Sequence, residues 1–413
     1  MTPQNPCCRF CGASLDQLFA DLGTTPLSNQ FVTDEQASAG LDRPYPLTVR
    51  VCGECFLVQA DEAVAQSEIF DDQYMYFSSY SDSWVAHAKR YSEAMQDRFH
   101  LSKSSLVVEV ASNDGYLLQH FQTSGIDVLG IEPTASTAEK AQKRGIKTRI
   151  DFFGQRLGRS LADEGIKANL MAANNVLAHV PDIRDFAAGF TELLASDGVV
   201  TFEFPHLLNL IRLGQFDTIY HEHYSYLSLL FVDRLMTAVG LRVFDVDELQ
   251  THGGSLRVYA CHSGAKYERT NSVRQLLEKE RGAGLGKLDT YAEFSKLVDR
   301  SVESFRAFLT AARSEGKTVY AYGAAAKGNT FFNVCGVDQQ DVVCIADRSH
   351  AKQGKLLPGS HIPIVSPEKL LSESPDYIII VPWNLVGEIT EGLKPITEKG
   401  AQLVTTIPET KVL

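Results

Sequence analysis

Two closely spaced cysteine pairs constrain the N-terminal segment more than any other feature of this sequence. Cys8 and Cys11 form one Cys-x-x-Cys pair, and Cys52 and Cys55 form the other. Two such pairs supply the four thiolates of a tetrahedral zinc site, which leaves no coordination position for water or substrate. We therefore expect a structural zinc that folds a small lobe. Two disulfides or a redox dithiol are the alternatives, and the adjacent Cys7 is less favourably spaced to serve as a ligand.

The length and charge of the chain set bounds on its organisation and partners. A chain of 413 residues exceeds what one hydrophobic core usually serves, so we expect three folded parts. The 51 acidic residues outnumber the 39 basic ones, and the net charge of −12 argues against a nucleic-acid partner. Residues 1–6 lack the apolar core of a signal peptide, and no apolar run is long enough to cross a membrane. We therefore expect a cytoplasmic protein without a membrane partner.

A strand–turn–helix pattern indicates a cofactor site. The segment LVVEVASNDG (residues 106–115) begins as a buried strand and leads through small and polar residues into a helix. Glu132 ends the next predicted strand, where a carboxylate can bind the hydroxyl pair of a ribose. The turn lacks the Gly-x-Gly-x-x-Gly fingerprint of pyrophosphate binding, so S-adenosylmethionine fits better than a dinucleotide. The alternative is an ordinary α/β turn with solvated acidic residues.

The residues expected to bind S-adenosylmethionine follow the carboxyl ends of successive strands, because ligands of open parallel sheets bind there. They come from the first turn, from the end of the second strand, from an adenine-contacting segment after the third, and from the loop after the fourth. These residues are Glu109, Ala111, Asn113, Asp114, Glu132, Pro133, Asp151, Phe152, Asn174 and Asn175.

A dense set of proton-active side chains occupies YHEHY (residues 220–224). A zinc protease helix would need a second histidine four residues after His221, and Ser225 stands there instead. We therefore favour proton transfer over metal binding for this segment. His179, after a predicted strand, and the polar aromatic segment 74–79 are further candidates. For any one of these residues the alternative is a buried tyrosine or histidine with satisfied hydrogen bonds.

Ordered motifs along nearly the whole chain resemble those of the nucleotide-sugar C-methyltransferases that build branched deoxysugars from 4-keto intermediates. Besides the paired cysteines, the motifs are PLSNQ (26–30), YMYFSS (74–79), EVASNDG (109–115), NNVLAH (174–179), YHEH (220–223) and GAAAKGN (323–329). The resemblance implies an α/β protein in three parts. These are a zinc-binding lobe (1–68), a Rossmann-like class I methyltransferase domain (69–265), and a helical connector with a C-terminal Rossmann-like domain that binds the nucleotide sugar (266–413). Strand-like segments at 317–322, 342–346 and 377–381 agree independently with a second α/β unit.

The resemblance also implies a reaction. A methyl group is transferred from S-adenosylmethionine, which leaves as S-adenosylhomocysteine, to a sugar carbon beside the C-4 ketone of a nucleoside-diphosphate 4-keto-6-deoxysugar. The carbon is expected to be C-3. A general base must remove a weakly acidic proton while the developing enolate oxygen is stabilised. The matching active-site residues are His223, which is our candidate base, and Tyr220, Glu222, His179 and Tyr76.

Further residues are expected to bind the substrate. Lys327 lies near a predicted helix start in the C-terminal unit, where a diphosphate could bind, although the order of residues is not that of a Walker loop. The full set is Tyr74, which is a register alternative to Tyr76, together with Ser78, Ser79, His221, Tyr224, Lys327 and Asn329. A monomer is compatible with the resemblance.

Two other functions stay open at the level of sequence. A nicotinamide-dependent nucleotide-sugar oxidoreductase would use the C-terminal unit, but the missing Gly-x-Gly-x-x-Gly counts against it. A non-catalytic zinc- and nucleotide-binding module would leave the tyrosine and histidine cluster as structural packing. Two ligand-binding units around a proton-active cluster argue against that module.

Overall fold

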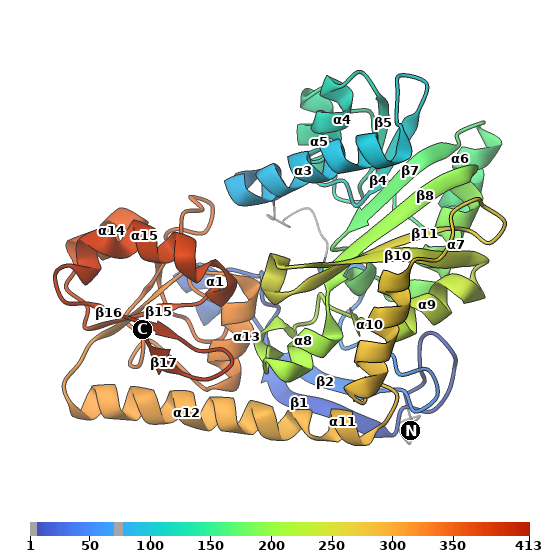
Figure 1. Cartoon of the computed structure of the whole chain (residues 1–413). Helices are drawn as coiled ribbons and strands as arrows, with labels where there is room; N and C mark the ends of the chain where they lie inside the picture. The colour runs from blue at the N-terminus through green and yellow to red at the C-terminus, as the bar shows by residue number, and fades with distance from the viewer. Residues whose placement is uncertain (1–5, 70–76) are drawn as a thin grey trace.

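The protein is a mixed α/β structure built on three sheets. The computed structural model describes residues 6–69 and 77–413, and within them the strands form sheets of four, seven and six strands. Figure 1 shows the seven-stranded sheet with its helices on the upper right and the six-stranded sheet on the lower left. This architecture confirms the predicted α/β class.

The four-stranded sheet joins the N-terminal lobe to a segment far along the chain. It consists of β1 (Gln17–Thr25), β2 (Tyr45–Val51), β3 (Val58–Ala60) and β9 (Ser225–Tyr226), in that order. All its pairings are antiparallel, and Val58 on β3 pairs with Tyr226 on β9. The short helices α1 (Asp34–Ser38) and α2 (Gln66–Ile69) belong to the same part of the sequence. Because β9 directly follows residues 220–224, this pairing fixes the proton-active segment to the lobe.

The seven-stranded sheet forms the central part of the molecule. Its strands, in spatial order, are β10 (Leu241–Leu249), β11 (Ser255–His262), β8 (Leu194–Pro205), β7 (Ala168–Asn174), β4 (Leu106–Val110), β5 (Asp127–Ile131) and β6 (Thr148–Arg149). The strands from β8 to β6 run parallel, and β11 and β10 extend the sheet in antiparallel fashion. The carboxyl ends of the parallel strands therefore meet at one edge, where ligands bind in open sheets.

Helices cover both faces of the central sheet, which explains why its strands are apolar throughout. Val107 and Val108 of β4 are both fully buried, and they belong to cores on opposite faces. One face packs against α3 (Asp82–Phe99), α4 (Leu118–Thr123) and α5 (Ala135–Lys143). The other packs against α6 (Gln155–Asp163), α7 (Ile183–Leu193) and α9 (Leu229–Ala238). Short 3₁₀ helices η1 (Ser78–Tyr80), η2 (Leu177–His179), η3 (Phe216–Thr218) and η4 (Thr251–Gly253), and helix α8 (Leu207–Arg212), surround the strand ends.

The C-terminal part begins with three helices and ends with a second α/β unit. The helices are α10 (Asn271–Gly282), α11 (Asp289–Ala292) and α12 (Phe294–Ser314). The sheet contains, in spatial order, β14 (Ile364–Val365), β13 (Ile345–Ala346), β12 (Val319–Tyr322), β15 (Tyr377–Ile380), β16 (Gln402–Thr405) and β17 (Lys411–Val412). Helices α13 (Ala326–Val334), α14 (Pro367–Ser372) and α15 (Val386–Thr397) and the 3₁₀ helix η5 (Trp383–Leu385) accompany it. No helix within residues 6–69 and 77–413 is long and apolar enough to span a membrane.

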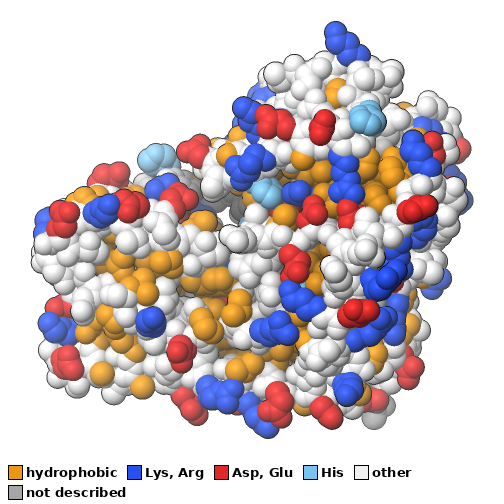
Figure 2. All heavy atoms as spheres, viewed as in Figure 1, with side chains coloured by type: hydrophobic (Ala, Val, Ile, Leu, Met, Phe, Trp, Pro, Cys, Tyr) orange, Lys and Arg blue, Asp and Glu red, His pale blue; other side chains and the backbone are white. Residues whose placement is uncertain are grey.

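One hydrophobic core joins the three parts of the molecule. It contains Phe19 of β1, Ile219 after η3, Phe305 of α12 and Phe331 of α13. Phe19 also stacks on Phe294 with ring centroids 4.4 Å apart. Helix α12 runs beneath both the C-terminal sheet and β1 (Figure 1). Figure 2 shows the surface hollowed between the C-terminal part and the central part, with acidic and basic side chains interspersed around it.

Glu280 links helix α10 to helix α9 of the central part, and we expect its removal to destabilise the protein. Its fully buried carboxylate accepts the N–H groups of Leu229 and Leu230 at the start of α9, both at 2.7 Å, and Nε2–H of His206 at 2.8 Å. Glu280→Ala leaves these donors without an acceptor, so the free energy of unfolding should fall by about 3 kcal/mol in urea denaturation. The exposed neighbour Glu278 is the control, and Glu278→Ala should change it by less than about 0.5 kcal/mol. Equal effects would contradict this role.

Candidate active site and metal centre

Four cysteine thiols converge beside the N-terminal sheet. The Sγ atoms of Cys8, Cys11, Cys52 and Cys55 all lie within 4.8 Å of one another, and the Cys8–Cys55 and Cys11–Cys52 distances are both 3.5 Å. A tetrahedron with zinc–sulfur bonds of about 2.3 Å has sulfur atoms about 3.8 Å apart, so the four thiols fit zinc. Across the described parts of the chain, no other group of histidine, cysteine and carboxylate side chains converges in this way.

Each cysteine pair lies on the same kind of turn. The carbonyl of Cys8 accepts the N–H of Gly12 at 2.9 Å, and the carbonyl of Cys52 accepts the N–H of Phe56 at 3.0 Å. Gly12 and Phe56 both have positive φ, at 76° and 61°. Glycine adopts this conformation freely, whereas the phenylalanine is strained in it. The repeated turn aims the two thiols of each pair at a common centre.

The turn after β4 is closed by the carboxylate of Glu132. Ala111 and Asn113 have φ values of 56° and 48°, so the chain reverses sharply after the strand. The Glu132 carboxylate at the end of β5 accepts the N–H groups of Asn113 and Thr134, both at 2.9 Å. Burial raises the pKa of Glu132, and these hydrogen bonds oppose that shift. Glu132 therefore stands at the strand end, where a ribose would bind.

The segment before α3 is held against the same turn. Oγ of Ser79 donates a hydrogen bond to the Asp114 carboxylate, and the N–H of Ser78 donates to Oδ1 of Asn113 at 2.9 Å. Nη2 of Arg144 lies 3.4 Å from Oδ2 of Asp114. Ser79 therefore contacts Asp114, and Ser78 contacts Asn113. Tyr74 and Tyr76 lie outside the described residues.

Buried oxygen atoms near the ends of β4 and β7 lack a hydrogen-bond partner in the described structure. They include Oε2 of Glu109, Oγ of Ser112, Oδ1 of Asp114, Oδ1 of Asn174 and Oδ1 of Asn175. Burial also raises the pKa of Glu109 well above its ordinary value. Buried acceptors without partners are costly, and S-adenosylmethionine offers an ammonium group, ribose hydroxyls and a positively charged sulfur. The acceptors at these strand ends therefore fit this cofactor.

The end of β6 presents an aromatic ring near this cofactor region. Phe152 exposes 45% of its surface, although large aromatic rings are usually buried. Its neighbour Asp151 lies 3.7 Å from Arg156, and Pro133 directly follows Glu132 on the adjacent strand. An exposed ring of this kind can stack on the face of an adenine.

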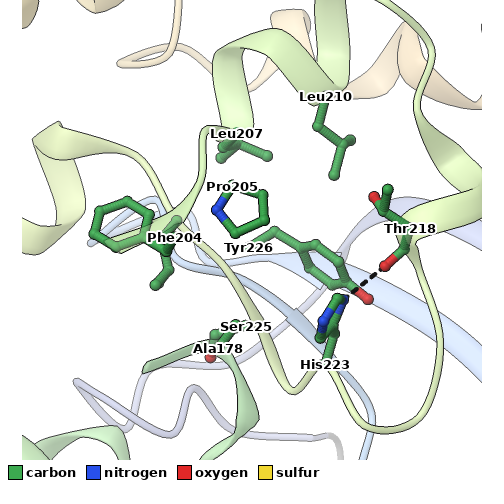
Figure 3. A pocket seen from close by; sticks show the side chains of 10 residues that line it. Ala178, Phe204, Pro205, Leu207, Leu210, Thr218, His223, Ser225 and Tyr226 are labelled. Atoms are coloured by element: carbon green, nitrogen blue, oxygen red, sulfur yellow. Dashed lines mark hydrogen bonds between the residues drawn. The ribbon is translucent and has the colours of Figure 1, made fainter. Parts of the chain in front are cut away.

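Two histidines and a tyrosine meet beside the carboxyl end of β7. The ring centroids of His179 and His223 are 4.7 Å apart, and those of Tyr220 and His223 are 4.0 Å apart. Nδ1–H of His223 donates to the carbonyl of Thr218 at 2.7 Å, as Figure 3 shows. This hydrogen bond assigns the proton to Nδ1 and leaves Nε2 as an acceptor. Burial, and then the charge of His179, lower the pKa of His223 well below its ordinary value.

A small internal cavity lies behind the His223 ring (Figure 3). Its volume of about 20 Å³ is enough for one water molecule. Most of the lining is apolar, and Thr218, Ser225 and Tyr226 contribute polar groups. The cavity is too small for a ligand much larger than a water molecule.

The other residues of the proton-active segment face the N-terminal lobe. Nδ2 of Asn29 donates to Oε1 of Glu222 at 2.6 Å. Nε2 of His221 donates to the carbonyl of Pro46 at 3.1 Å, and the Tyr224 hydroxyl donates to the carbonyl of Val64 at 3.4 Å. His221 and Tyr224 therefore contact the lobe.

The C-terminal part contributes a half-buried cation to the same region. Nζ of Lys327, on α13, donates to Oδ1 of Asn384 at 2.6 Å and lies 4.4 Å from the ring centroid of Trp383. Nε1–H of Trp383 donates to Oδ2 of Asp217 at 2.6 Å. Burial lowers the pKa of Lys327 and raises that of Asp217 to about 6, and the two opposite charges partly offset these shifts. Lys327 is close enough for its charge to lower the pKa of His223 as well.

One predicted residue is buried, and the site region contains residues that the sequence analysis did not single out. Asn329 is fully buried in α13, where its Oδ1 accepts from Nδ2 of Asn333 at 3.3 Å and its Nδ2 has no partner in the described structure. The structure adds Asn29, Asp217 and His252 to the site region. Asn29 belongs to the quoted motif PLSNQ, so a signal for it existed. Asp217 and His252 carry no local pattern, because long-range contacts bring them to the site.

Comparison with known proteins gives the family. Three family models match, described as "Putative zinc binding domain" over residues 8–70, "Methyltransferase domain" over 85–246 and "C-methyltransferase C-terminal domain" over 250–408. C-methyltransferase NovU of Streptomyces niveus is 36% identical over 406 residues, which cover 98% of this chain and 96% of NovU. The chain belongs to the C-methyltransferase family. This C-methyltransferase uses S-adenosylmethionine, as the sequence predicted, and its four-thiol centre confirms the predicted zinc site.

Solved methyltransferase structures match parts of this C-methyltransferase. One match is magnesium protoporphyrin IX methyltransferase ChlM from Synechocystis PCC 6803, solved with bound S-adenosylhomocysteine. It is 14% identical, with a TM-score of 0.35, and the match covers 43% of this chain and 83% of ChlM. The glycopeptide N-methyltransferase MtfA is 15% identical, with a TM-score of 0.35, covering 42% of this chain and 96% of MtfA. Membership of the C-methyltransferase family rules out the two alternative functions, which were an oxidoreductase and a non-catalytic module.

Loss of one cysteine of the four-thiol centre should release the metal. We expect the C-methyltransferase to purify with about one zinc ion per chain and the Cys52→Ser variant with almost none, because a thiolate corner of the tetrahedron is lost. The melting temperature should fall together with the zinc content measured by mass spectrometry. Cys7→Ser is the matched control, since Cys7 is outside the centre, and it should keep both values. Full zinc in Cys52→Ser would contradict the assignment.

Proposed function

We propose that this enzyme methylates the carbon, C-3, next to the C-4 ketone of a nucleoside-diphosphate 4-keto-6-deoxysugar. The observation that carries the proposal is the state of His223, whose Nδ1–H bond to the Thr218 carbonyl leaves Nε2 free to accept a proton. A carbon next to a ketone becomes a nucleophile only after it loses a proton. A neutral imidazole near the cofactor strands meets that requirement.

His223 is the general base of this proposal. Its pKa is lowered by burial, so the imidazole is neutral at the working pH and ready to accept a proton at Nε2. The Thr218 carbonyl holds the ring through Nδ1 and stabilises the imidazolium that forms. Positioned bases of this kind contribute roughly 10²- to 10⁴-fold to the rate.

Donors around His223 stabilise the charge that develops on the keto oxygen. Tyr220 and His179 contact the His223 ring, and Tyr76 completes the set expected from the sequence. One such donor is worth roughly 10²- to 10³-fold. Glu222, held by Asn29, is available to bind a sugar hydroxyl or to orient a histidine.

The strand ends of the central sheet would hold the cofactor. Glu132, the turn residues 111–114 and the acceptors of Asn174 and Asn175 hold S-adenosylmethionine. When bound, S-adenosylmethionine supplies the electrophilic methyl group. Phe152 packs against its adenine, and Asp151 and Pro133 flank the same region.

The C-terminal unit binds the nucleotide part of the substrate. Lys327 supports this role, because it brings a cation from the start of α13 toward the central part. The backbone N–H groups at a helix start and a nearby lysine together suit the negative charge of a diphosphate. Ser78, Ser79, His221, Tyr224 and Asn329 complete the substrate-binding set expected from the sequence, and the buried Nδ2 of Asn329 has no partner in the described structure and can donate to a ligand.

Direct turnover tests the substrate class. We would incubate the enzyme with methyl-labelled S-adenosylmethionine and a panel of thymidine, guanosine and cytidine diphosphate 4-keto-6-deoxysugars, in deuterated water. The expected result is transfer of label to a carbon of one sugar, with deuterium exchange beside the ketone when S-adenosylhomocysteine replaces the methyl donor. Nucleotide sugars that have a C-4 hydroxyl instead of the ketone are the control and should give neither signal. Transfer to the C-4 hydroxyl sugars would contradict the enolate mechanism.

The role of His223 is tested by substitution. His223→Asn removes the base, so kcat should fall about 10²- to 10⁴-fold while the affinity for S-adenosylhomocysteine stays within about twofold. His262→Asn is the control, because His262 also contacts a backbone carbonyl, that of Leu194, at the end of β11. Full turnover in His223→Asn would refute the assignment.

The pH dependence gives a separate test of the same residue. A base whose pKa is lowered stays unprotonated to lower pH, so the acidic limb of kcat/KM should lie below the ordinary histidine value of about 6.5. Initial rates at subsaturating sugar from pH 5 to 9 measure this limb. A limb at or above the ordinary value would show that a different group, or a charged His223, controls the reaction.

A further inference from the structure

His252 occupies an unusual backbone position beside the cofactor strands. It lies in η4, between β10 and β11, with φ of 52° and ψ of 28°. Residues other than glycine seldom adopt this left-handed conformation, and such strain often accompanies function. The next two residues, Gly253 and Gly254, also have positive φ, at 84° and 109°.

The turn that carries His252 is anchored from several sides. Oγ1 of Thr251 donates to Oε1 of Glu203 at 3.2 Å, and Nε2 of Gln215 donates to the carbonyl of Gly253 at 3.0 Å. A Cβ atom on Gly253 would lie 2.2 Å from the Trp383 ring, so the C-terminal part packs directly on the turn. These contacts over-determine the strained conformation and fix where the imidazole lies.

The imidazole of His252 contacts a residue at the end of β7. Nδ2 of Asn175 donates to Nε2 of His252 at 3.4 Å, and the ring centroid of Trp84 lies 5.2 Å from that of His252. Asn175 also has a left-handed backbone, with φ of 52°. Its Oδ1 is buried without a partner in the described structure. The amide group of Asn175 is planar. When His252 holds Nδ2, Oδ1 therefore points away from His252.

His252 accepts this hydrogen bond over the whole working range of pH. Burial, and then the charge of Lys327, lower the pKa of His252 to about 4, so the ring is neutral. A protonated imidazole would have only donors and would repel the amide N–H groups. Neutrality therefore keeps Nε2 available to Asn175.

We propose that His252 is a positioning residue, which orients the Asn175 side chain so that Oδ1 receives the positively charged methionine end of S-adenosylmethionine. This inference rests on the cofactor-binding role proposed above for Asn175. His252 itself touches neither the reacting carbon nor the methyl group. The Thr251–Gly253 turn thus belongs to the cofactor site, although it lies on the antiparallel edge of the sheet.

A double-mutant cycle on cofactor affinity tests the proposal without any sugar substrate. The proteins are the wild type, His252→Gly, Asn175→Gly and the double variant, since glycine accepts both left-handed positions without strain. Calorimetric titration with S-adenosylmethionine should show affinity about tenfold weaker for Asn175→Gly and about fivefold weaker for His252→Gly. The double variant should be no weaker than Asn175→Gly, because His252 acts through Asn175.

A matched control separates positioning from loss of structure. His100 ends α3 with the same φ of 52° and is exposed, so His100→Gly makes the same backbone change away from the site. It should leave the affinity unchanged. The melting temperature of His252→Gly should not fall, because the strain is relieved.

Two results would overturn the proposal, and they point to different faults. Additive losses, or wild-type affinity in His252→Gly, would show that His252 does not act through Asn175. Wild-type affinity in Asn175→Gly would remove the cofactor role of Asn175 as well. Neither result depends on which sugar the enzyme methylates.

Discussion

The pairing of β3 with β9 is the contact on which the active site depends. β3 belongs to the lobe that the four thiols hold together, and β9 follows residues 220–224. This pairing carries the proton-active segment from the central part to the edge of the lobe. Asn29 of the lobe then holds Glu222, and η3 presents the Thr218 carbonyl to His223. The four-thiol centre thus supports the segment to which we assign the proton chemistry.

Burial of the site sets the protonation of its histidines. His179 and His252 have pKa values lowered to about 4, and the pKa of His223 is lowered as well, each chiefly by burial. Neutral imidazole rings can act as acceptors and as a base, whereas charged rings can only donate. Lys327 from the C-terminal part adds a cation beside them. Because Trp383 packs on the His252 turn and donates to Asp217, the C-terminal part helps to form the candidate site.

The sequence predicts features that arise from local spacing and misses those that arise from distant contacts. The cysteine pairs and the turn after β4 are local features. The spacing of the cysteines and the buried strand that contains Glu109 therefore predict them from the sequence alone. The sequence predicts Lys327 near the start of a helix. Its approach to Asp217 and His223 depends instead on how the C-terminal unit packs against the central part. The substrate role expected for Asn329 stays a prediction, because its burial in α13 depends on packing that periodicity alone does not reveal. His252 could not be predicted from the sequence, because the contacts that fix its turn come from residues far along the chain. Trp383 packs on Gly253, and Glu203 accepts a hydrogen bond from Thr251.

The protonation of His223 is the most direct test of the account. Nitrogen-15 NMR of the histidine-labelled enzyme, with the resonance assigned through His223→Asn, reports the tautomer and the titration of the ring. The account predicts a neutral ring protonated at Nδ1, which titrates below the ordinary value of about 6.5. A ring protonated at Nε2, or an imidazolium at neutral pH, would contradict it, because neither form has the free Nε2 that removes the proton.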